Sequence, residues 1–195
     1  MTYSYDYPHP AVTTDIVIFT VMKGSLHILL IKRGEAPFKG NWAIPGGFLR
    51  MDESLDHCAA RELREETNLS DVYLEQLFTF GTVNRDPRER VISVAYYALI
   101  ASDNIKLKAG TDAADVNWFP LSALPDLAFD HYEIVKMARN RLAAKMDYSS
   151  IGLKLMPPLF TLSELQATYE IVSNKRLDKR NFRKWILSLD LMVET

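Results

Sequence analysis

The sequence has few of the features that mark a specialised class of protein. It contains a single cysteine, Cys58, so no disulfide can form within the chain. Its 8 glycines and 9 prolines among 195 residues are too few for a collagen-like or low-complexity protein. Lysine and arginine total 23 while aspartate and glutamate total 25, so net charge indicates neither a nucleic-acid-binding nor a membrane-surface protein. Any such function must depend on a local patch of charge.

Long hydrophobic runs are also lacking. The longest, such as residues 16–22, are far shorter than the roughly 20 residues that a membrane-spanning helix needs. Residues 1–15 lack the basic region and the apolar region that together make a signal peptide. We therefore expect a cytoplasmic protein with no membrane partner.

The remaining composition, 48% hydrophobic and 25% charged, is that of a globular chain. Runs rich in β-branched and aromatic residues predict strands at residues 16–21, 26–31, 43–48, 72–82, 91–100 and 115–119. The first two flank a short turn and predict a hairpin. Apolar residues at helical spacing predict helices at residues 54–67, after Ser54 as N-cap, and 131–145. Hairpins combined with two helices indicate an α+β architecture.

A second, smaller domain is expected near the C-terminus. Residues 147–152 have the composition of a linker, so we divide the chain into domains of residues 1–148 and 153–195. The second domain contains two predicted helices, residues 162–172 with Thr161 as N-cap and residues 179–187 with Asp178 as N-cap.

The first of the long helices carries an acidic face. Glu62, Glu65 and Glu66 are spaced i, i+3 and i+4, so they project from one side of a helix. Like charges at i, i+4 destabilise an isolated helix by roughly 0.2–0.5 kcal/mol, and a hard divalent cation such as Mg²⁺ or Mn²⁺ would relieve that repulsion. The alternative is a solvated acidic face, which is common in globular helices.

The wider segment resembles the Nudix box, G-x5-E-x7-R-E-U-x-E-E-x-G-U, where U is aliphatic. The matching residues are Gly47, Glu53, Arg61, Glu62, Leu63, Glu65, Glu66 and Leu69. Asn68 stands where the family has glycine, and this departure concerns helix termination, because asparagine tolerates the left-handed conformation. The resemblance implies a Nudix-type α/β/α sandwich built on a mixed sheet.

The resemblance also implies metal-dependent hydrolysis of a nucleoside diphosphate linked to another group. It assigns the metal ions to Glu62, Glu65 and Glu66, with the Gly46 carbonyl as a further ligand. Glu66 would contact the nucleophilic water, Glu53 would complete the acidic cluster and Arg61 would orient it. A general base outside the box stays open among four candidates, Asp86, Glu89, Asp112 and Asp115.

Segments outside the box resemble one branch of the family, the ADP-ribose pyrophosphatases and the related NrtR-type regulators of NAD metabolism. These segments are residues 7–12, 32–42 and 85–88. The branch implies ADP-ribose, cleaved to AMP and ribose 5-phosphate, as the nucleoside diphosphate sugar, and a homodimer. The residues that suit this ligand are Arg33, Arg85 and Arg88 for its phosphates, Phe38 and Trp42 for its adenine, and Gly47 beside it. Core packing is the alternative for each aromatic residue, and a solvated loop is the alternative for Arg88.

Residues 160–184 resemble the winged helix-turn-helix of those regulators. Six basic residues and one acidic residue lie between positions 175 and 184. Such a helix fits the major groove of DNA, with Asn181 able to read a base edge and the basic residues on phosphates, namely Lys179, Arg180, Arg183 and Lys184. A solvated face of a helical appendage is the alternative. Because the sequence stops at Thr195, we expect the wing hairpin to be missing and this domain to be winged-helix-like only.

Two functions of different classes follow. The first is a Mg²⁺- or Mn²⁺-dependent pyrophosphohydrolase acting on ADP-ribose, which the three metal glutamates favour. The second is a transcriptional regulator whose Nudix domain senses ADP-ribose or a related ligand and whose C-terminal domain binds DNA. A nucleotide-sanitising hydrolase is a weaker third hypothesis, because it leaves the C-terminal segment unexplained.

Overall fold

The computed structural model describes residues 5–67, 72–101 and 113–193, with backbone alone at residues 113 and 114. The described strands are β1 (Ala11–Met22), β2 (Ser25–Arg33), β3 (Trp42–Ala43), β4 (Gly46–Phe48), β5 (Tyr73–Phe80), β6 (Val91–Leu99) and β7 (Ala113–Pro120). The described helices are α1 (Leu55–Thr67), α2 (His131–Met146), the 3-10 helix η2 (Ser150–Leu155), α3 (Leu162–Ser173) and α4 (Lys179–Leu187). The predicted residues Asn68, Leu69 and Asp112 lie outside the described ranges.

Strand β1 is the centre of a mixed sheet. It pairs antiparallel with β2 through the predicted hairpin, antiparallel with β4 near its start, and parallel with β6 along most of its length. β5 continues the sheet beyond β6, while β3 and β7 both pair with β2. A strand paired on both edges satisfies its backbone hydrogen bonds internally, so β1 can be buried along most of its length.

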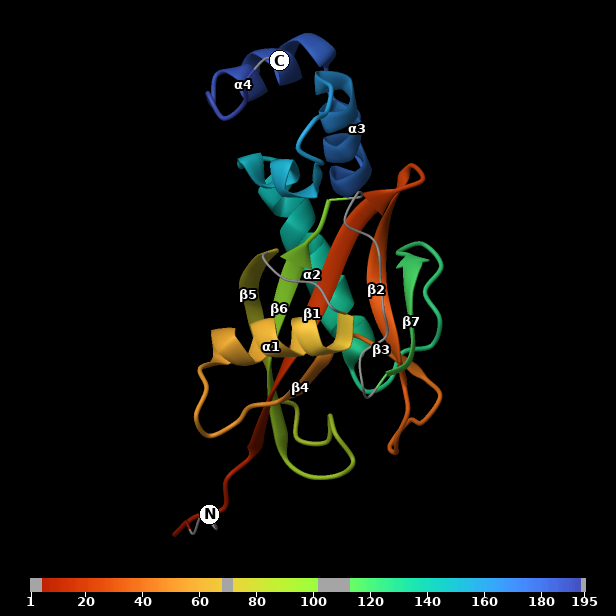
Figure 1. Ribbon diagram of the computed structural model, residues 1–195, viewed down its shortest axis with the longest axis vertical. Helices are drawn as coiled ribbons and strands as arrows, with labels where there is room; N and C mark the ends of the chain where they lie inside the picture. The colour runs from red at the N-terminus through yellow and green to blue at the C-terminus, as the bar shows by residue number, and fades with distance from the viewer. Residues whose placement is uncertain (1–4, 68–71, 102–112, 194–195) are drawn as a thin grey trace.

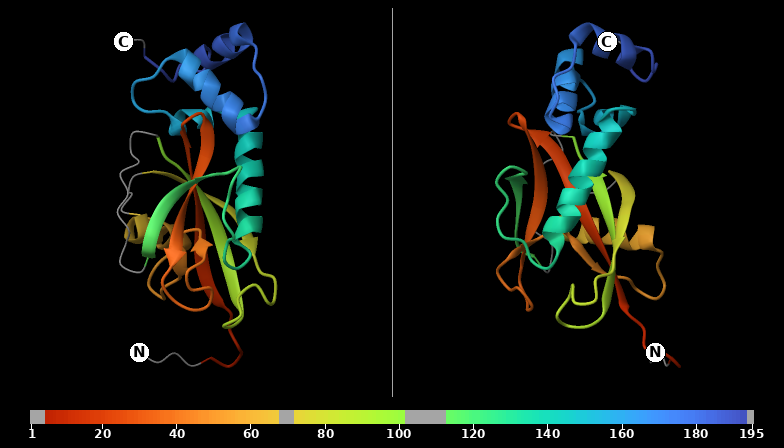
Figure 2. Two further views of the ribbon diagram at one scale, coloured as in Figure 1. Left: turned by 90° about the vertical axis from the view of Figure 1, so that its right-hand side faces the viewer. Right: turned by 180° about the vertical axis from the view of Figure 1, so that it is seen from behind.

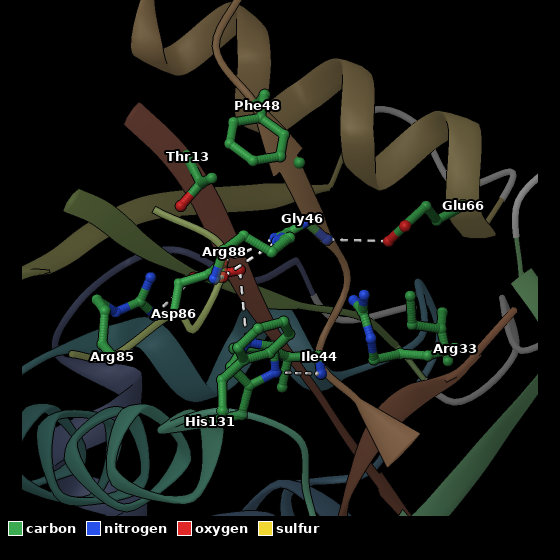
Figure 3. A pocket seen from close by; sticks show the side chains of 14 residues that line it. Thr13, Arg33, Ile44, Gly46, Phe48, Glu66, Arg85, Asp86, Arg88 and His131 are labelled. Atoms are coloured by element: carbon green, nitrogen blue, oxygen red, sulfur yellow. Dashed lines mark hydrogen bonds and ion pairs between the residues drawn. The ribbon is translucent and has the colours of Figure 1, made fainter. Parts of the chain in front are cut away.

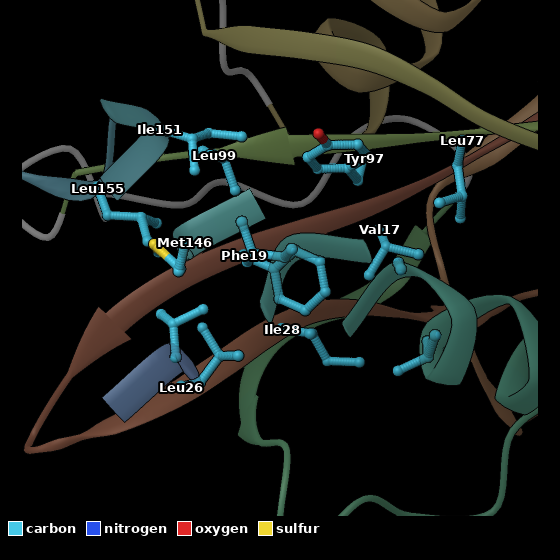
Figure 4. Close-up of a cluster of buried hydrophobic side chains, with 14 of the residues drawn as sticks. Val17, Phe19, Leu26, Ile28, Leu77, Tyr97, Leu99, Met146, Ile151 and Leu155 are labelled. Atoms are coloured by element: carbon cyan, nitrogen blue, oxygen red, sulfur yellow. The ribbon is translucent and has the colours of Figure 1, made fainter. Parts of the chain in front are cut away.

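Helices cover both faces of this sheet (Figures 1 and 2). Alternate side chains of a strand point to opposite faces, so Ile16 and Ile18 pack in the cluster beneath α1. Val17 and Phe19 point the other way, into the larger cluster beneath α2 that Figure 4 draws. The predicted α/β/α sandwich on a mixed sheet is therefore confirmed.

Helix α1 begins where the sequence predicts. The Ser54 hydroxyl accepts a hydrogen bond from the backbone N–H of His57 at 3.2 Å, as an N-cap does. Cys58, Ala59 and Leu63 are buried against the sheet, and Cys58 lies 3.3 Å from the Thr14 hydroxyl of β1. This packing fixes which side of the helix is left for the glutamates.

The C-terminal helices share the larger core with the sheet. Leu165 and Tyr169 of α3 belong to the same buried cluster as Phe19 and Leu26. Residues 147–152 connect the two segments as expected, but they are not an exposed linker. Ser150–Leu155 form a packed 3-10 helix, because its apolar side chains find burial beneath α3.

Side-chain caps fix the starts of α3 and α4. The Thr161 hydroxyl accepts a hydrogen bond from the Glu164 N–H at 3.2 Å, and the Glu164 carboxylate accepts one from the Thr161 N–H at 2.7 Å. This is the predicted capping box. The Asp178 carboxylate caps α4 by accepting from the Asn181 N–H at 2.8 Å. Among the helices that the structure describes, none is both long and apolar enough to cross a membrane.

Tyr169 tests whether the two segments unfold together. Its ring is 1% exposed and its hydroxyl donates a hydrogen bond to the Ser149 carbonyl at 2.9 Å. We expect Tyr169→Ala to lower the free energy of unfolding by about 3–5 kcal/mol, because it leaves a cavity in a shared core. Chemical denaturation followed by far-UV circular dichroism measures this effect in a single cooperative transition.

Tyr148→Ala is the matched control, because Tyr148 is 68% exposed. It should change the free energy of unfolding by less than about 0.5 kcal/mol. Two separate transitions in Tyr169→Ala, with the main one unmoved, would contradict a shared core.

Candidate functional site

A cleft open to solvent lies at the end of the sheet where β1 meets β4 (Figure 3). Its lining comes from β1, β2, β4, the last turn of α1, the β5–β6 loop and the start of α2. The lining residues are Thr13, Asp15, Ile31, Arg33, Ile44, Gly46, Gly47, Phe48, Glu66, Arg85, Asp86, Arg88, Phe129 and His131. Acidic, basic and aromatic side chains therefore meet in one concave site, which is the usual form of a ligand pocket.

Arg85 is the buried positive charge of this cleft. Its guanidinium donates two hydrogen bonds to Asp130, at 2.6 and 2.9 Å, and one to Asp15 at 3.3 Å. Burial alone would lower the pKa of Arg85, but the hydrogen bonds that it donates to the two carboxylates, and their negative charges, outweigh burial and raise the pKa. The Ser93 hydroxyl also donates to Asp15, so this carboxylate is held from two sides.

His131, the first residue of α2, is a buried neutral imidazole. Its Nδ1 accepts a hydrogen bond from the Ile44 N–H at 3.1 Å, so the ring proton is on Nε2. Nε2 lies 3.8 Å from the Asp15 carboxylate. Burial lowers the pKa of His131 despite that carboxylate, so the ring stays uncharged at neutral pH.

Arg88 lies at the mouth of the cleft between a carboxylate and two aromatic rings. Its guanidinium donates to both oxygens of Asp86, at 2.7 and 3.0 Å. The same group lies 5.2 Å from the ring centre of Phe48 and 5.7 Å from that of Phe129. Burial would raise the pKa of Asp86, but the bonds from Arg88 hold it below its usual value. Asp86 is therefore a paired anion, and this pairing argues against Asp86 as the general base.

Arg33 carries the positive charge that is most available to a ligand. Its Nε donates to the Pro37 carbonyl at 2.8 Å, and its guanidinium lies 4.8 Å from the Phe129 ring centre. Among the described residues no carboxylate lies within ion-pairing distance of Arg33. Burial and the nearby charge of Arg88 lower the pKa of Arg33, because both disfavour its charged form. An anion bound in the cleft would pair with the Arg33 guanidinium and offset this cost.

The carboxylates of the Nudix-like helix gather around Arg61. Its guanidinium donates to Glu53 at 2.6 and 2.9 Å, to Glu62 at 2.5 Å and to Glu65 at 3.1 Å. These bonds raise the pKa of Arg61 and lower the pKa of Glu53 to about 2, with the Arg61 hydrogen bond as the main cause. The predicted orienting role of Arg61 thus has a geometric basis, and repulsion between the glutamates is largely relieved within the protein itself.

Two glycines let the remaining carboxylates approach the sheet. A side chain at Gly47 would collide with the Glu62 carboxylate, so only glycine leaves space for it. Burial raises the pKa of Glu62 more than Arg61 lowers it. The Glu66 carboxylate accepts a hydrogen bond from the Gly46 N–H at 2.9 Å, which joins the last turn of α1 to β4 (Figure 3).

The donor set suits a hard divalent cation, because all three predicted side-chain ligands are carboxylates. The Glu62 carboxylate lies directly against the Gly47 backbone. Within residues 5–67, 72–101 and 113–193, however, no three His, Cys, Asp or Glu side chains form a preassembled metal site. Glu62, Glu65, Glu66 and the Gly46 carbonyl therefore stay predicted ligands.

The structure brings only part of the predicted ligand site together. Arg33, Gly46, Gly47, Glu66, Arg85 and Arg88 all line the cleft. Phe38 and Trp42 do not line it. Trp42 packs edge-on against Phe119, with ring centres 4.7 Å apart, which is the core-packing alternative. Phe38 packs in the same way on Phe129, so it supports a lining ring instead of lining the cleft itself.

The sequence analysis missed several lining residues. Asp15, Phe48, Phe129 and His131 line the cleft, and Asp130 anchors Arg85 beside it. Asp15 had a detectable signal, because it is an acidic residue inside a strand whose neighbours are all apolar or hydroxylated. Phe129 and Asp130 lie in a segment with no motif, so nothing local marks them.

The basic side chains of α4 form a second candidate surface. Lys179, Arg180, Asn181, Arg183 and Lys184 are all exposed, while Phe182 and Ile186 are buried on the opposite side of the helix. Lys175 and Arg176 before the helix are paired with Asp147 and Glu170. In the part of the chain that the structure describes, the four basic residues of α4 make no ion pair.

Comparison with known families agrees with both parts of this architecture. The NUDIX domain model matches residues 9–138, which contain the cleft and the carboxylate helix. The chain belongs to the Nudix family. The model of the NrtR DNA-binding winged helix domain matches residues 152–195 of this Nudix protein, including α3 and α4.

Two characterised relatives share different lengths of this Nudix chain. The ADPR responsive transcriptional repressor NtrR of Acinetobacter baylyi is 42% identical over 194 residues, which is 97% of this chain and 77% of the relative. The ADP-ribose pyrophosphatase of Methanocaldococcus jannaschii is 42% identical over 130 residues, 67% of this chain and 73% of the relative. The alignment with the repressor covers nearly the whole chain and so includes the C-terminal segment.

A solved structure shows the same arrangement of both segments. Shewanella oneidensis NrtR, crystallised with a 27mer DNA, superimposes with a TM-score of 0.85 at 37% identity. The alignment covers 94% of this Nudix protein and 85% of the Shewanella chain. The fold of the whole chain is therefore that of a Nudix domain followed by a DNA-binding type of helical domain.

Arg85 provides a test of the electrostatic core of the cleft. We expect Arg85→Met to lower the free energy of unfolding by about 3–5 kcal/mol, because it leaves the buried Asp15 and the partly buried Asp130 without their partner. Urea denaturation at neutral pH measures this difference.

Arg64→Met is the matched control, because Arg64 is exposed on α1. Its effect should stay within about 0.5 kcal/mol. Equal stabilities for the two variants would show that the buried ion pairs do not hold the cleft together.

Proposed function

We propose that this protein is a ligand-responsive DNA-binding regulator, in which the Nudix cleft binds ADP-ribose and α4 contacts DNA. The observation that carries the proposal is the full-length similarity to an ADPR-responsive repressor, which spans the cleft and the C-terminal helices alike. The homodimer expected from the sequence stays a prediction.

The cleft has the charges that a diphosphate ester requires. Arg33 provides a guanidinium without a carboxylate partner among the described residues, whereas the charge of Arg85 at the floor is balanced by Asp15 and Asp130. The rings of Phe48 and Phe129 offer apolar faces at the mouth. Guanidinium groups bind phosphates through paired hydrogen bonds, and aromatic rings bind nucleobases by stacking.

The surface of α4 has the charges that a DNA backbone requires. Four basic side chains are exposed on one short helix whose other side is anchored by Phe182 and Ile186. A helix fixed in this way presents its cations in a constant geometry, so several can meet phosphates at once. Asn181 is the exposed residue on the same helix that is suited to a base edge.

The DNA-binding surface is tested by salt dependence. Duplexes selected from a random pool by the wild-type chain would be titrated with Arg180→Ala and Arg183→Ala by fluorescence anisotropy. Each variant should bind more weakly and should reduce the salt slope of the affinity by about 1, because one phosphate contact is lost. Adding ADP-ribose to the wild-type complex should release the DNA.

Lys136→Ala is the control, since Lys136 is an exposed lysine on α2, outside the C-terminal segment. It should leave both affinity and salt slope unchanged. A wild-type chain that selects no DNA, or DNA binding that ignores ADP-ribose, would contradict the regulator.

Hydrolysis of ADP-ribose is the second candidate function. It is favoured by the complete set of box carboxylates, which a pure sensor does not need, and by the similarity to an ADP-ribose pyrophosphatase. Glu62, Glu65, Glu66 and the Gly46 carbonyl would hold Mg²⁺ or Mn²⁺, and such an ion supplies activated water and neutralises phosphate charge. Arg61 holds Glu53, Glu62 and Glu65 in fixed orientation, and Arg33 would hold the phosphates.

Turnover distinguishes the two functions. We expect the wild-type chain to release AMP from ADP-ribose with Mg²⁺ or Mn²⁺, and EDTA to abolish the release. Glu66→Gln should lower the rate at least about 100-fold, because it removes a charge that the metal ion requires. Glu133→Gln, an exposed site on α2, is the control. If ADP-ribose binds but is not hydrolysed with either metal ion, only the regulator function remains.

A further inference from the structure

We propose that Phe48 and Phe129 form a clamp that stacks on the adenine base of the ligand, and that Arg88 fills this clamp until the base displaces it. The inference rests on the proposed function, because it names the part of the ADP-ribose cleft that recognises the base. Nothing in the sequence motifs assigns a role to either ring.

The clamp is assembled from two distant parts of the chain. Phe48 ends β4 and Phe129 directly precedes Asp130 and α2, yet both line the same cleft. The guanidinium of Arg88 lies against both rings, 5.2 Å from one centre and 5.7 Å from the other. A guanidinium is planar and delocalised, so it occupies the kind of space that a planar base would fill.

Packing in the hydrophobic core does not account for the positions of the Phe48 and Phe129 rings. Phe48 is 41% exposed and belongs to none of the buried clusters formed by the described residues. Phe129 touches only the edge of a small cluster around Ala128. Apolar rings that stay in contact with water at the rim of a polar cleft are typical of a ligand-binding surface.

The backbone at Phe129 is strained in a way that aims its ring. Phe129 has a φ of 53°, a left-handed conformation that bulky residues rarely adopt. Hydrogen bonds on both sides hold it there: the Ala128 N–H donates to the Trp42 carbonyl at 2.8 Å, and Asp130 is fixed by Arg85. Strain that is retained by its surroundings is common at ligand-binding sites.

Arg88 can leave the rings through solvent, because its side chain is 39% exposed while its partner Asp86 is buried. Stacking of a base on an aromatic side chain contributes about 5- to 150-fold. When Arg88 moves, Asp86 keeps the hydrogen bond from the Arg88 backbone N–H at 2.9 Å, so this buried carboxylate stays partnered.

The clamp also sets the direction of the ligand. Arg33 and Glu66 lie in the same cleft but apart from Asp86 and Arg88 (Figure 3). With the base between Phe48 and Phe129, the diphosphate extends toward Arg33 and the carboxylate helix. This orientation brings the phosphates to the predicted metal ligands.

The test compares the affinity for ADP-ribose of four chains by isothermal titration calorimetry, in EDTA and again with Mg²⁺. Phe129→Leu keeps an apolar side chain without a ring, and Phe129→Asn suits the left-handed backbone without a ring. Both should bind ADP-ribose at least about tenfold more weakly than wild type. Phe78→Leu, at an exposed ring on β5 that does not line the cleft, should bind as wild type does.

A second readout separates stacking from structural support. The adenine H2 and H8 resonances of bound ADP-ribose should move upfield in the wild-type complex and move less in Phe129→Leu. A ring with a purely structural role would change the melting temperature and leave these shifts alone. Unchanged affinity or unchanged shifts in the folded Phe129 variants overturn the clamp.

Arg88→Ala tests the displacement. Because Arg88 must leave the rings before the base can bind, its removal should tighten the affinity for ADP-ribose. An affinity equal to or weaker than that of wild type would overturn its role as occupant. If the wild-type chain binds no ADP-ribose, the proposed function fails, and this outcome is distinct from a failure of the clamp.

Discussion

The buried charge of Arg85 is the interaction on which the cleft depends. Its guanidinium joins Asp15 in the central strand to Asp130 at the start of α2, so one side chain ties a loop, the sheet and a helix. A buried cation needs such partners, because removing either carboxylate would leave an uncompensated charge. The bond to Asp130 also holds the strained backbone of Phe129 beside it, and His131 follows directly. The ion pair between Arg85 and Asp130 at the floor of the cleft thus positions the Phe129 ring at its mouth.

Arg61 plays a different electrostatic role on the other side of β4. It collects three carboxylates that a helix alone would force into repulsion, and it does so with a fixed fork of donors. The chain can therefore fold with its acidic box intact before any cation arrives. These hydrogen bonds let the folded Nudix domain keep its acidic box next to a balancing positive charge.

Local features of the sequence predicted the fold well and the cleft incompletely. The hairpin, the Ser54 cap and the capping box at Thr161 depend on residues within a few positions, and all three are confirmed. The contacts of Arg85 join residues 45 and 70 positions apart, which no periodicity reveals. Trp42 was predicted to face the ligand, but its neighbour Phe119 comes from a strand whose pairing with β2 could not be read from spacing. The full-length likeness to a repressor also puts regulation ahead of hydrolysis, which the glutamates alone had favoured.

Helix α2 gives the molecule a mechanical property. Its first residue, His131, lies in the cleft, and its last, Met146, is buried in the core that also contains Leu165 and Tyr169 of α3. A helix of 16 residues is about 24 Å long and stiff along its axis. One regular element therefore begins in the cleft and ends in the core that contains α3, so the two parts of the protein rest on a common support.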